Sequence, residues 1–371
     1  MLFKDLGRTS VRLSAVGQGT GLGGYSTNPS TYDDMVGVIR AGIDSGMTFI
    51  DTAPAYGDGS SEIAVGRAIA GRRNEVVLAT KVASENLTFD EVIASAEASL
   101  KRIGTDHIDL YQIHWSNPTV PIAETIGAMA ELVSSGKVGQ IGVSNFSLGE
   151  LKAAEAALAP NVLAAVQVEY NLFDRSIEDA LLSYCQNAGI SVIAYSPLHR
   201  GLIASGARQL DVIERIATAH DRTPAQIALR WLIEQDRVVV IPNTSRIERV
   251  EQNAEAADFD LSESEIDEID RVCALQQSLV PTDSIFVKID PSRPFYGNLE
   301  EAVENALGLS PSPKELADQI QAGDFLKPVR LVPAKNTEAK YEVRGGRLRY
   351  WAWIIAHGND VPIPALIEED N

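Results

Sequence analysis

The sequence predicts an α/β protein, a (β/α)8 barrel followed by a small α+β domain. Three observations lead to this prediction. Short β-branched runs alternate with helical segments from residue 47 to about residue 255, eight such units fit into about 260 residues, and the composition changes after Ala274. Strands that alternate with helices imply a parallel sheet. Eight units in this length favour a closed barrel.

Eight strands are expected in the first part of the chain, each followed by a helical segment. In order they are SAVGQGT (14–20), MTFIDTA (47–53), EVVLATKV (75–82), HIDLYQIH (107–114), VGQIGVSN (138–145), AAVQVEY (164–170), SVIAYSP (191–197) and RVVVIPN (237–243). Helical segments such as 89–104 repeat apolar residues at i, i+3, i+4 and i+7. An open doubly wound sheet is the weaker alternative, because the glycines of GQGTGLGG (17–24) precede no immediate helix.

The C-terminal part has the pattern of a second domain. We expect the barrel to span 1–275, a linker to span 276–282 and the second domain to span 283–371. Its expected elements are a strand at 285–291, a capped helix at 311–323, a strand pair at 329–334 and 341–346, a helix at 347–358 and a last strand at 362–370.

Composition limits the possible partners and the compartment. The chain of 371 residues has a formal net charge of −19, which argues against a general phosphate-binding surface and makes nucleic acid an unexpected partner. Cys185 and Cys273 lie far apart, so a disulfide framework is not expected. The N-terminus lacks a secretory apolar run, and no stretch reaches the roughly 20 apolar residues of a membrane helix. We therefore expect a cytoplasmic protein with small-molecule partners.

Four titratable residues follow the expected strands at the end where barrel chemistry collects. Asp51 ends the second strand, Tyr56 follows it, Lys81 ends the third and His114 ends the fourth. A nearby ammonium would stabilise a tyrosinate and lower the pKa of the phenol. Asp51 would hold Lys81, and His114 could bind a carbonyl oxygen. The set suits protonation of an alkoxide as a hydride arrives, and no metal site is expected.

The first 275 residues resemble the aldo-keto reductase superfamily, which implies a TIM barrel. The matching stretches are LGRTSVRLSAVGQGT, GMTFIDTAPAYGDGSSE, LATK, IDLYQIHW, IGVSNFS, VQVEYN, IAYSPL and IPNTSRIERVEQN. The resemblance implies a catalytic tetrad of Asp51, Tyr56, Lys81 and His114, with Tyr56 as the general acid. It further implies reduction of an aldehyde or ketone with NADPH, or the reverse oxidation of an alcohol. An alternative is a redox sensor that binds NADP(H), turns over slowly and signals through the C-terminal domain.

The resemblance also implies a cofactor site without a Rossmann fold. Ser144, Asn145 and Gln167 resemble the carboxamide contacts, Tyr195 the residue that stacks on nicotinamide, and Ser196, Leu198 and Gly201 the pyrophosphate loop. Arg246 and Arg249 would reach the 2′-phosphate, and Gln252 and Asn253 the adenine. The remaining implied contacts are Gly19, Thr20, Asp51, Ile241, Asn243, Thr244 and Ser245. Asn243 stands where many members have lysine or glycine, so NADH is the less favoured alternative.

Four residues are expected at the mouth of the substrate pocket. Tyr25 lies in the first loop, Tyr56 and His114 belong to the tetrad, and Trp115 follows His114. Trp115 could equally pack under a loop. The pocket would take a small carbonyl compound or alcohol.

Residues 283–370 resemble the ParB/sulfiredoxin-like domain. The resemblance rests on RGGRLRYWA at the start of a helix, on the following strand with IPA, and on the order of elements. It implies an anion site made by Gly345, Gly346, Arg347 and Arg349 at a helix N-terminus, for a nucleotide or another phosphorylated ligand. Arg347 stands where sulfiredoxins have cysteine, so that reductase activity is not expected. Packing, dimerisation or regulation is the alternative role, and DNA binding is not expected.

Overall fold

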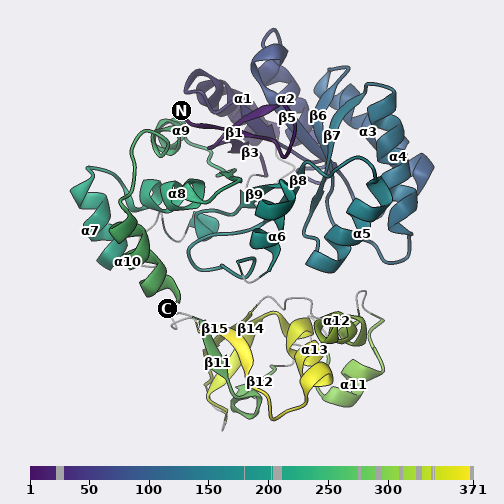
Figure 1. Ribbon diagram of the computed structural model, residues 1–371, viewed down its shortest axis with the longest axis vertical. Helices are drawn as coiled ribbons and strands as arrows, with labels where there is room; N and C mark the ends of the chain where they lie inside the picture. Colours follow the sequence, from purple (N-terminus) through teal and green to yellow (C-terminus); the bar gives the residue numbers. More distant parts are fainter. Residues whose placement is uncertain are drawn as a thin grey trace. The chain divides into compact units, whose positions relative to one another are not determined.

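Eight parallel strands form the core of the first part of the chain (Figure 1). The computed structural model describes residues 1–21, 29–178, 180–201, 203, 211–274, 277–288, 295–308, 312–322, 328–335, 337 and 339–367. The chain divides into two compact units. The first comprises Met1–Phe146, Glu150–Asp174 and Leu181–Ile266, and the second comprises Ser147–Gly149, Arg175–Ala180 and Asp267–Asn371.

The strands of the first unit follow one another in sequence order around a barrel. They are β3 (Gln18–Gly19), β4 (Phe49–Asp51), β5 (Val77–Val82), β6 (Ile108–Ile113), β7 (Val138–Ser144), β8 (Ala165–Glu169), β9 (Ser191–Tyr195) and β10 (Val238–Val240). A parallel bridge between Val16 and Val240 joins the last strand to the residues before the first. The predicted (β/α)8 barrel is therefore confirmed.

Helices alternate with these strands along the chain. Those after the strands are α1 (Pro29–Asp44), α2 (Ser60–Ile69), α3 (Phe89–Ile103), α4 (Ile122–Ser134), α5 (Leu148–Leu158), α6 (Leu181–Ala188), α7 (Asp211–Ala219), α8 (Pro224–Glu234), α9 (Ile247–Glu255) and α10 (Glu263–Ala274). The ends of α3 show why the sequence forms a helix there. Thr88 and Glu91 make a capping box at its start, and Gly104 ends it in the left-handed region.

An N-terminal hairpin fills the end of the barrel where the strands begin. Its antiparallel strands, β1 (Phe3–Asp5) and β2 (Arg12–Ser14), were not predicted. Leu6 and Leu13 are fully buried in one cluster with barrel residues that include Phe49 and Leu110. Because apolar side chains close this end, polar chemistry is left to the opposite end, where the strands finish.

The second unit contains a five-stranded mixed sheet with helices, as expected for an α+β fold. The strand order is β11 (Gln277–Val280), β15 (Ile363–Ile367), β13 (Val329–Pro333), β14 (Tyr341–Gly345) and β12 (Ile285–Phe286). The helices are α11 (Leu299–Val303), α12 (Pro313–Gln321) and α13 (Arg347–His357). Trp351 donates from Nε1 to the Tyr296 carbonyl at 3.2 Å inside the core of this unit.

Part of the expected linker is a strand. Residues 276–282 have the polar composition of a connection, but Gln277–Val280 form β11 and pair antiparallel with β15. Val280 is buried while Leu279 is 71% exposed, which is the alternation of an edge strand. The partner strand lies more than 80 residues further along the chain, so local composition carried no sign of it. Helix α11 was not predicted either. Within the described residues, no helix has the length and apolarity needed to cross a membrane.

Candidate active site

A buried ion pair occupies the ends of β4 and β5. Lys81 Nζ donates to Asp51 Oδ2 at 2.6 Å, and the two side chains are 0% and 1% exposed. The same ammonium donates to the Thr52 carbonyl at 3.0 Å and to Tyr56 Oη at 3.3 Å. Burial works to lower the pKa of Lys81, but the Asp51 carboxylate and Tyr56 outweigh it and raise that pKa. Lys81 therefore remains an ammonium beside the phenol.

Tyr56 and His114 lie together at the same end of the barrel. Tyr56 sits in the loop after β4, whose backbone is tied by the bond from Gly59 N to the Pro54 carbonyl at 2.8 Å. The rings of Tyr56 and His114 are 5.9 Å apart and nearly perpendicular. Burial, followed by the charge of Lys81, lowers the pKa of His114 to about 3. The imidazole is therefore neutral at physiological pH and can donate or accept a hydrogen bond without carrying charge.

The lowered pKa of His114 predicts a loss of stability in acid. An unfolded histidine titrates near 6.5, so below that pH the unfolded chain binds a proton that folded His114 refuses until about 3. The free energy of unfolding should therefore fall as pH decreases through this window. We expect His114→Gln to remove about 2 kcal/mol of this acid sensitivity between about pH 7 and pH 4.5 in urea titrations. His107→Gln is the control, because that side chain is 40% exposed; equal effects of both changes would contradict the prediction.

Two glutamine side chains meet at the other oxygen of Asp51. Gln167 Nε2 donates to Asp51 Oδ1 at 2.7 Å, and Gln112 Nε2 donates to the same atom at 3.2 Å. Gln167 was predicted as a cofactor contact, whereas Gln112 was missed. Its signal in the sequence is a glutamine between Tyr111 and Ile113 in the expected strand, LYQIH.

The residues predicted to contact nicotinamide are linked to one another and to the tetrad. Asn145 has a left-handed backbone (φ 61°), and its Nδ2 donates to the His114 carbonyl at 3.1 Å and to Ser144 Oγ at 3.0 Å. Tyr195 Oη donates to Asn145 Oδ1 at 2.9 Å. Ser196 is also left-handed (φ 49°). Such strain in residues other than glycine concentrates at functional sites, and here it follows the ends of β7 and β9.

A narrow crevice brings together several residues predicted to hold the adenosine part of the cofactor. It is lined by the residues after β3 and β10 and by α1 and α9: Gln18, Gly19, Thr20, Met35, Val38, Ile39, Met47, Pro242, Asn243, Thr244, Val250 and Asn253. Ile241, which precedes this loop, is buried. The Thr20 hydroxyl is already used within the protein, since it donates to the Asp51 carbonyl at 2.9 Å and accepts from Ser61 Oγ at 2.8 Å.

Arg246 and Arg249 lie at the start of α9, next to this crevice in sequence. Arg246 is exposed and Arg249 is half-buried. Within the described parts of the chain, neither guanidinium forms an ion pair. Ser245 and Gln252 are exposed on the same segment. Among the described residues, the two guanidinium groups therefore remain available to a ligand anion.

The remaining predicted residues are only partly placed. Leu198 is half-buried after β9, and Gly201 has φ 87° at the end of a 3-10 helix, His199–Gly201. Trp115 is 51% exposed beside His114, as a residue at a pocket mouth would be. Tyr25 lies outside the described residues.

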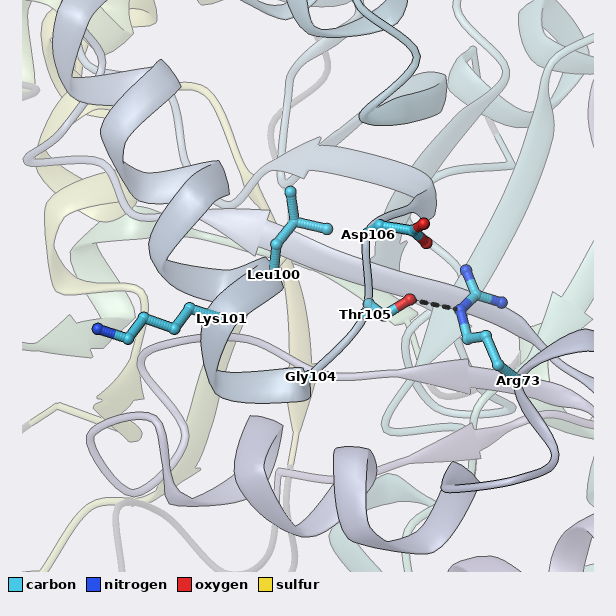
Figure 2. A pocket seen from close by; sticks show the side chains of 6 residues that line it. All are labelled: Arg73, Leu100, Lys101, Gly104, Thr105 and Asp106. Carbon is cyan, nitrogen blue, oxygen red and sulfur yellow. Dashed lines mark hydrogen bonds between the residues drawn. The ribbon is translucent and has the colours of Figure 1, made fainter.

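A surface hollow of about 550 Å³ lies at the opposite end of the strands (Figure 2). It is lined by Arg73, Leu100, Lys101, Gly104, Thr105 and Asp106, which come before β5 and β6. Arg73 is fully engaged there, with Thr105 Oγ1 at 3.1 Å and Asp109 Oδ2 at 2.7 Å. This hollow lies where β5 and β6 begin, whereas Asp51, Lys81 and His114 lie where the strands end, so it is not the candidate active site.

Comparison with known proteins agrees with this geometry. The model of the aldo/keto reductase family matches residues 15–274. The chain belongs to the aldo/keto reductase family. One relative in this family is methylglyoxal reductase YeaE of Escherichia coli K12, 39% identical over 262 residues that cover 70% of this chain and 91% of the relative.

Solved structures of aldo-keto reductases are also similar to this chain. The thermostable aldo-keto reductase Tm1743, solved with the inhibitor epalrestat, is 40% identical with a TM-score of 0.69, covering 73% of this chain and 100% of that one. An aldo/keto reductase from Klebsiella pneumoniae, solved with NADP and acetate, is 38% identical with a TM-score of 0.64, covering 71% and 92%. The match to the aldo/keto reductase family ends at residue 274, before β11.

Proposed function

We propose that this chain is an NADPH-dependent aldo-keto reductase that reduces an aldehyde or ketone to an alcohol, or catalyses the reverse oxidation. One observation carries the proposal. The buried pair of Asp51 and Lys81, 2.6 Å apart, continues to half-buried Tyr56 at 3.3 Å, and neutral His114 lies beside the phenol. This arrangement suits a tyrosine that gives a proton to a carbonyl oxygen as the carbon receives a hydride.

Each residue of this group has a definite part in the proposed reaction. Tyr56 Oη donates its proton to the substrate oxygen, and the Lys81 ammonium stabilises the tyrosinate that remains. Asp51 keeps Lys81 charged and aimed at Tyr56. Neutral His114 donates a hydrogen bond that orients the carbonyl oxygen. When bound, NADPH supplies the hydride, so one hydride and one proton together convert the carbonyl to the alcohol.

The residues along the rim fit a nicotinamide cofactor. The amide nitrogen of Gln167 donates a hydrogen bond to Asp51. Its Oε1 is therefore the atom that can accept from a carboxamide N–H. Asn145 is fixed by Tyr195 at 2.9 Å, which also holds the Tyr195 ring at the edge of the site for stacking. Ser144 completes the expected carboxamide contacts.

Arg246 and Arg249 support NADPH rather than NADH. Both lack an ion-pair partner among the described residues, and both adjoin the crevice that includes Asn243 and Asn253. A guanidinium binds a phosphate through two parallel hydrogen bonds. The 2′-phosphate is present in NADPH and absent from NADH, so it is the group these arginines would select.

The substrate we propose is a small reactive carbonyl, in the first place a 2-oxoaldehyde. The support is the 39% identity to a protein named methylglyoxal reductase. Half-exposed Trp115 beside His114 would provide an apolar wall for a compact substrate.

The proposal is tested by following NADPH oxidation with methylglyoxal and a panel of other aldehydes, ketoses and keto acids. We expect Tyr56→Phe to lower kcat at least a hundredfold, because it removes the proton donor, while NADPH binding stays within about twofold. NADH is the comparison cofactor. If NADPH binds and no carbonyl is reduced faster by the wild type than by Tyr56→Phe, the reductase proposal fails, and a slow sensor that binds NADP(H) takes its place.

For the second unit we propose a ParB/sulfiredoxin-like domain that binds a phosphate-bearing ligand. The support is the start of α13, where the N-cap residue Gly346 is left-handed (φ 81°) and provides no capping side chain, and where the first turn lacks an acidic residue. Arg347 lies in that turn with its guanidinium 6.0 Å from the Phe295 ring, and Arg349 Nη1 donates to the Pro328 carbonyl at 3.0 Å. Gly345 ends β14 immediately before this turn.

Calorimetry of the full chain with ATP and with inorganic phosphate tests this second proposal. We expect Arg347→Ala to weaken binding about tenfold, as loss of one charge-assisted contact does, and Lys314→Ala on α12 to leave it unchanged. Absence of binding to the wild type, or equal binding by both variants, would leave packing or regulation as the role of this unit.

A further inference from the structure

Gln112 contacts Asp51 of the candidate active site from inside the barrel, and the geometry of this contact destabilises the folded protein. The side chain is fully buried, and its Nε2 donates to Asp51 Oδ1 at 3.2 Å. Its Oε1 has no hydrogen-bond partner among the described residues. A buried acceptor left unpaired typically destabilises a fold by about 1–3 kcal/mol. An apolar residue of similar length would avoid this penalty.

The orientation of the amide follows from the chemistry of its neighbour. Asp51 is ion-paired with Lys81 and is therefore ionised, and a carboxylate oxygen only accepts hydrogen bonds. The NH₂ end of Gln112 must face Asp51, because the opposite orientation would place two oxygen acceptors against each other. Oε1 therefore has no partner among the described residues because the NH₂ end of the same amide donates to Asp51.

The sheet register places Gln112 beside the ion pair. In the ladder between β5 and β6 Gln112 is opposite Lys81, and in the ladder between β6 and β7 it is opposite Gly142. A Cβ added at Gly142 would lie 3.1 Å from Gln112 Cγ, so glycine at this position leaves room for the longer side chain. Neighbouring strands therefore hold the glutamine close to both members of the pair.

We propose that Gln112 is a positioning residue of the reductase reaction, which fixes the Asp51 carboxylate and thereby keeps Lys81 aimed at Tyr56. The inference rests on the reductase function proposed above. Gln167 donates to the same oxygen, but it also lies where the cofactor carboxamide is expected. Gln112 is the donor that stays on Asp51 if Gln167 adjusts to the cofactor.

The first test is Gln112→Met, which keeps the side-chain length and removes the donor. We expect kcat to fall about tenfold, the size of one hydrogen bond to a charged group, with KM and NADPH binding within about twofold. The phenol of Tyr56 should titrate at higher pH in ultraviolet difference spectra, with Tyr56→Phe identifying its signal. Among the described residues, the charged and titratable groups near that phenol are Asp51, Lys81 and His114.

Thermal stability separates positioning from simple packing. Gln112→Met removes a buried unpaired acceptor, so we expect the melting temperature to stay the same or rise while kcat falls. A purely structural glutamine would show the reverse, lower stability with kcat preserved in the folded fraction. Gln140→Met on β7 is the matched control, since that half-buried side chain makes no hydrogen bond with described residues.

Gln112→Glu provides a second variant of nearly the same shape. A protonated carboxyl at this position donates to Asp51, whereas an ionised one repels it. We expect its kcat relative to wild type to increase as pH falls, opposite to the flat ratio expected for Gln140→Met. If Gln112→Met fails to fold, the pH dependence of kcat in Gln112→Glu still tests whether Gln112 positions Asp51.

The outcomes are separable from those of the reductase proposal. If wild type reduces carbonyls, Tyr56→Phe does not, and both Gln112 variants keep the wild-type kcat and pH profile, the role of Gln112 is overturned while the reductase function stands. If wild type reduces no carbonyl, the reductase function fails. In that case the titration of Tyr56 tests the positioning role of Gln112 by itself. An unchanged titration midpoint in Gln112→Met would overturn that role.

Discussion

We expect Lys81→Met to lower kcat/KM for carbonyl reduction about a thousandfold, within the range for loss of proton-transfer catalysis, and also to lower the free energy of unfolding. Lys81 Nζ lies 3.3 Å from Tyr56 Oη, so its removal takes away a positive charge that stabilises the tyrosinate formed in the reaction. Steady-state kinetics with NADPH and methylglyoxal measure the decrease in kcat/KM. A variant that retains turnover within about threefold of wild type would contradict the proposed proton-transfer chain.

The stability effect of Lys81→Met has a separate cause. Asp51 is 1% exposed, and removing Lys81 leaves a buried carboxylate that accepts from two amides among the described residues. Breaking a buried ion pair in this way typically costs 3–5 kcal/mol, so we expect a loss of about 3 kcal/mol in urea unfolding.

Two controls separate the two effects. The double change Asp51→Asn with Lys81→Met should recover most of the stability, because no buried charge remains, and none of the activity. Lys137→Met breaks the pair with Glu97, whose N–O distance is 2.5 Å but whose side chains are 40% and 55% exposed. Its expected effect on stability is below about 1 kcal/mol.

We expect Gly66→Ala to destabilise the fold by about 3 kcal/mol, at the upper end of the range for an overpacked core. A Cβ at Gly66 on α2 would lie 2.0 Å from the carbonyl oxygen of Ile103, the last residue of α3. Backbone cannot swing aside as a side chain can, so the two helices must separate. Ala64, Val65, Ala68 and Ile103 share one buried cluster, which would be opened by that movement.

Gly127→Ala is the matched control for this change. Gly127 lies inside α4, is exposed, and has no atom within 4 Å of an added Cβ. Alanine should therefore stabilise that helix by about 0.5–1 kcal/mol. Urea unfolding of both variants gives the comparison, and a Gly66→Ala protein as stable as wild type would show that α2 and α3 are not in tight contact.

Several parts of the fold followed from the sequence because their signals are local. Alternating β-branched and helical periods predicted all eight barrel strands, and the apolar repeat of residues 89–104 predicted α3. Since parallel strands of a barrel all finish at one end, predicting the strands also predicted that Asp51, Lys81 and His114 would converge. The structure brings them together with Tyr56.

Other features depend on residues that are distant in sequence. Glu62 could be recognised as a helix-start residue, but its burial depends on Arg102 of α3 at 2.5 Å and Thr80 of β5 at 2.7 Å. The strand β11 looks like a linker until β15 pairs with it. In both cases a polar segment is stabilised by a partner that local composition does not reveal.

The sequence by itself determined the barrel, its order of strands and the residues at the strand ends, because hydrophobic period and turn residues act over short range. The tertiary structure alone decided which polar atoms face one another. It placed two glutamine amides on one oxygen of Asp51 and made His114 neutral through burial beside Lys81. Hydrogen-bond partners and charge states depend on distances of a few ångströms between strands, and those distances exist only after the barrel has closed.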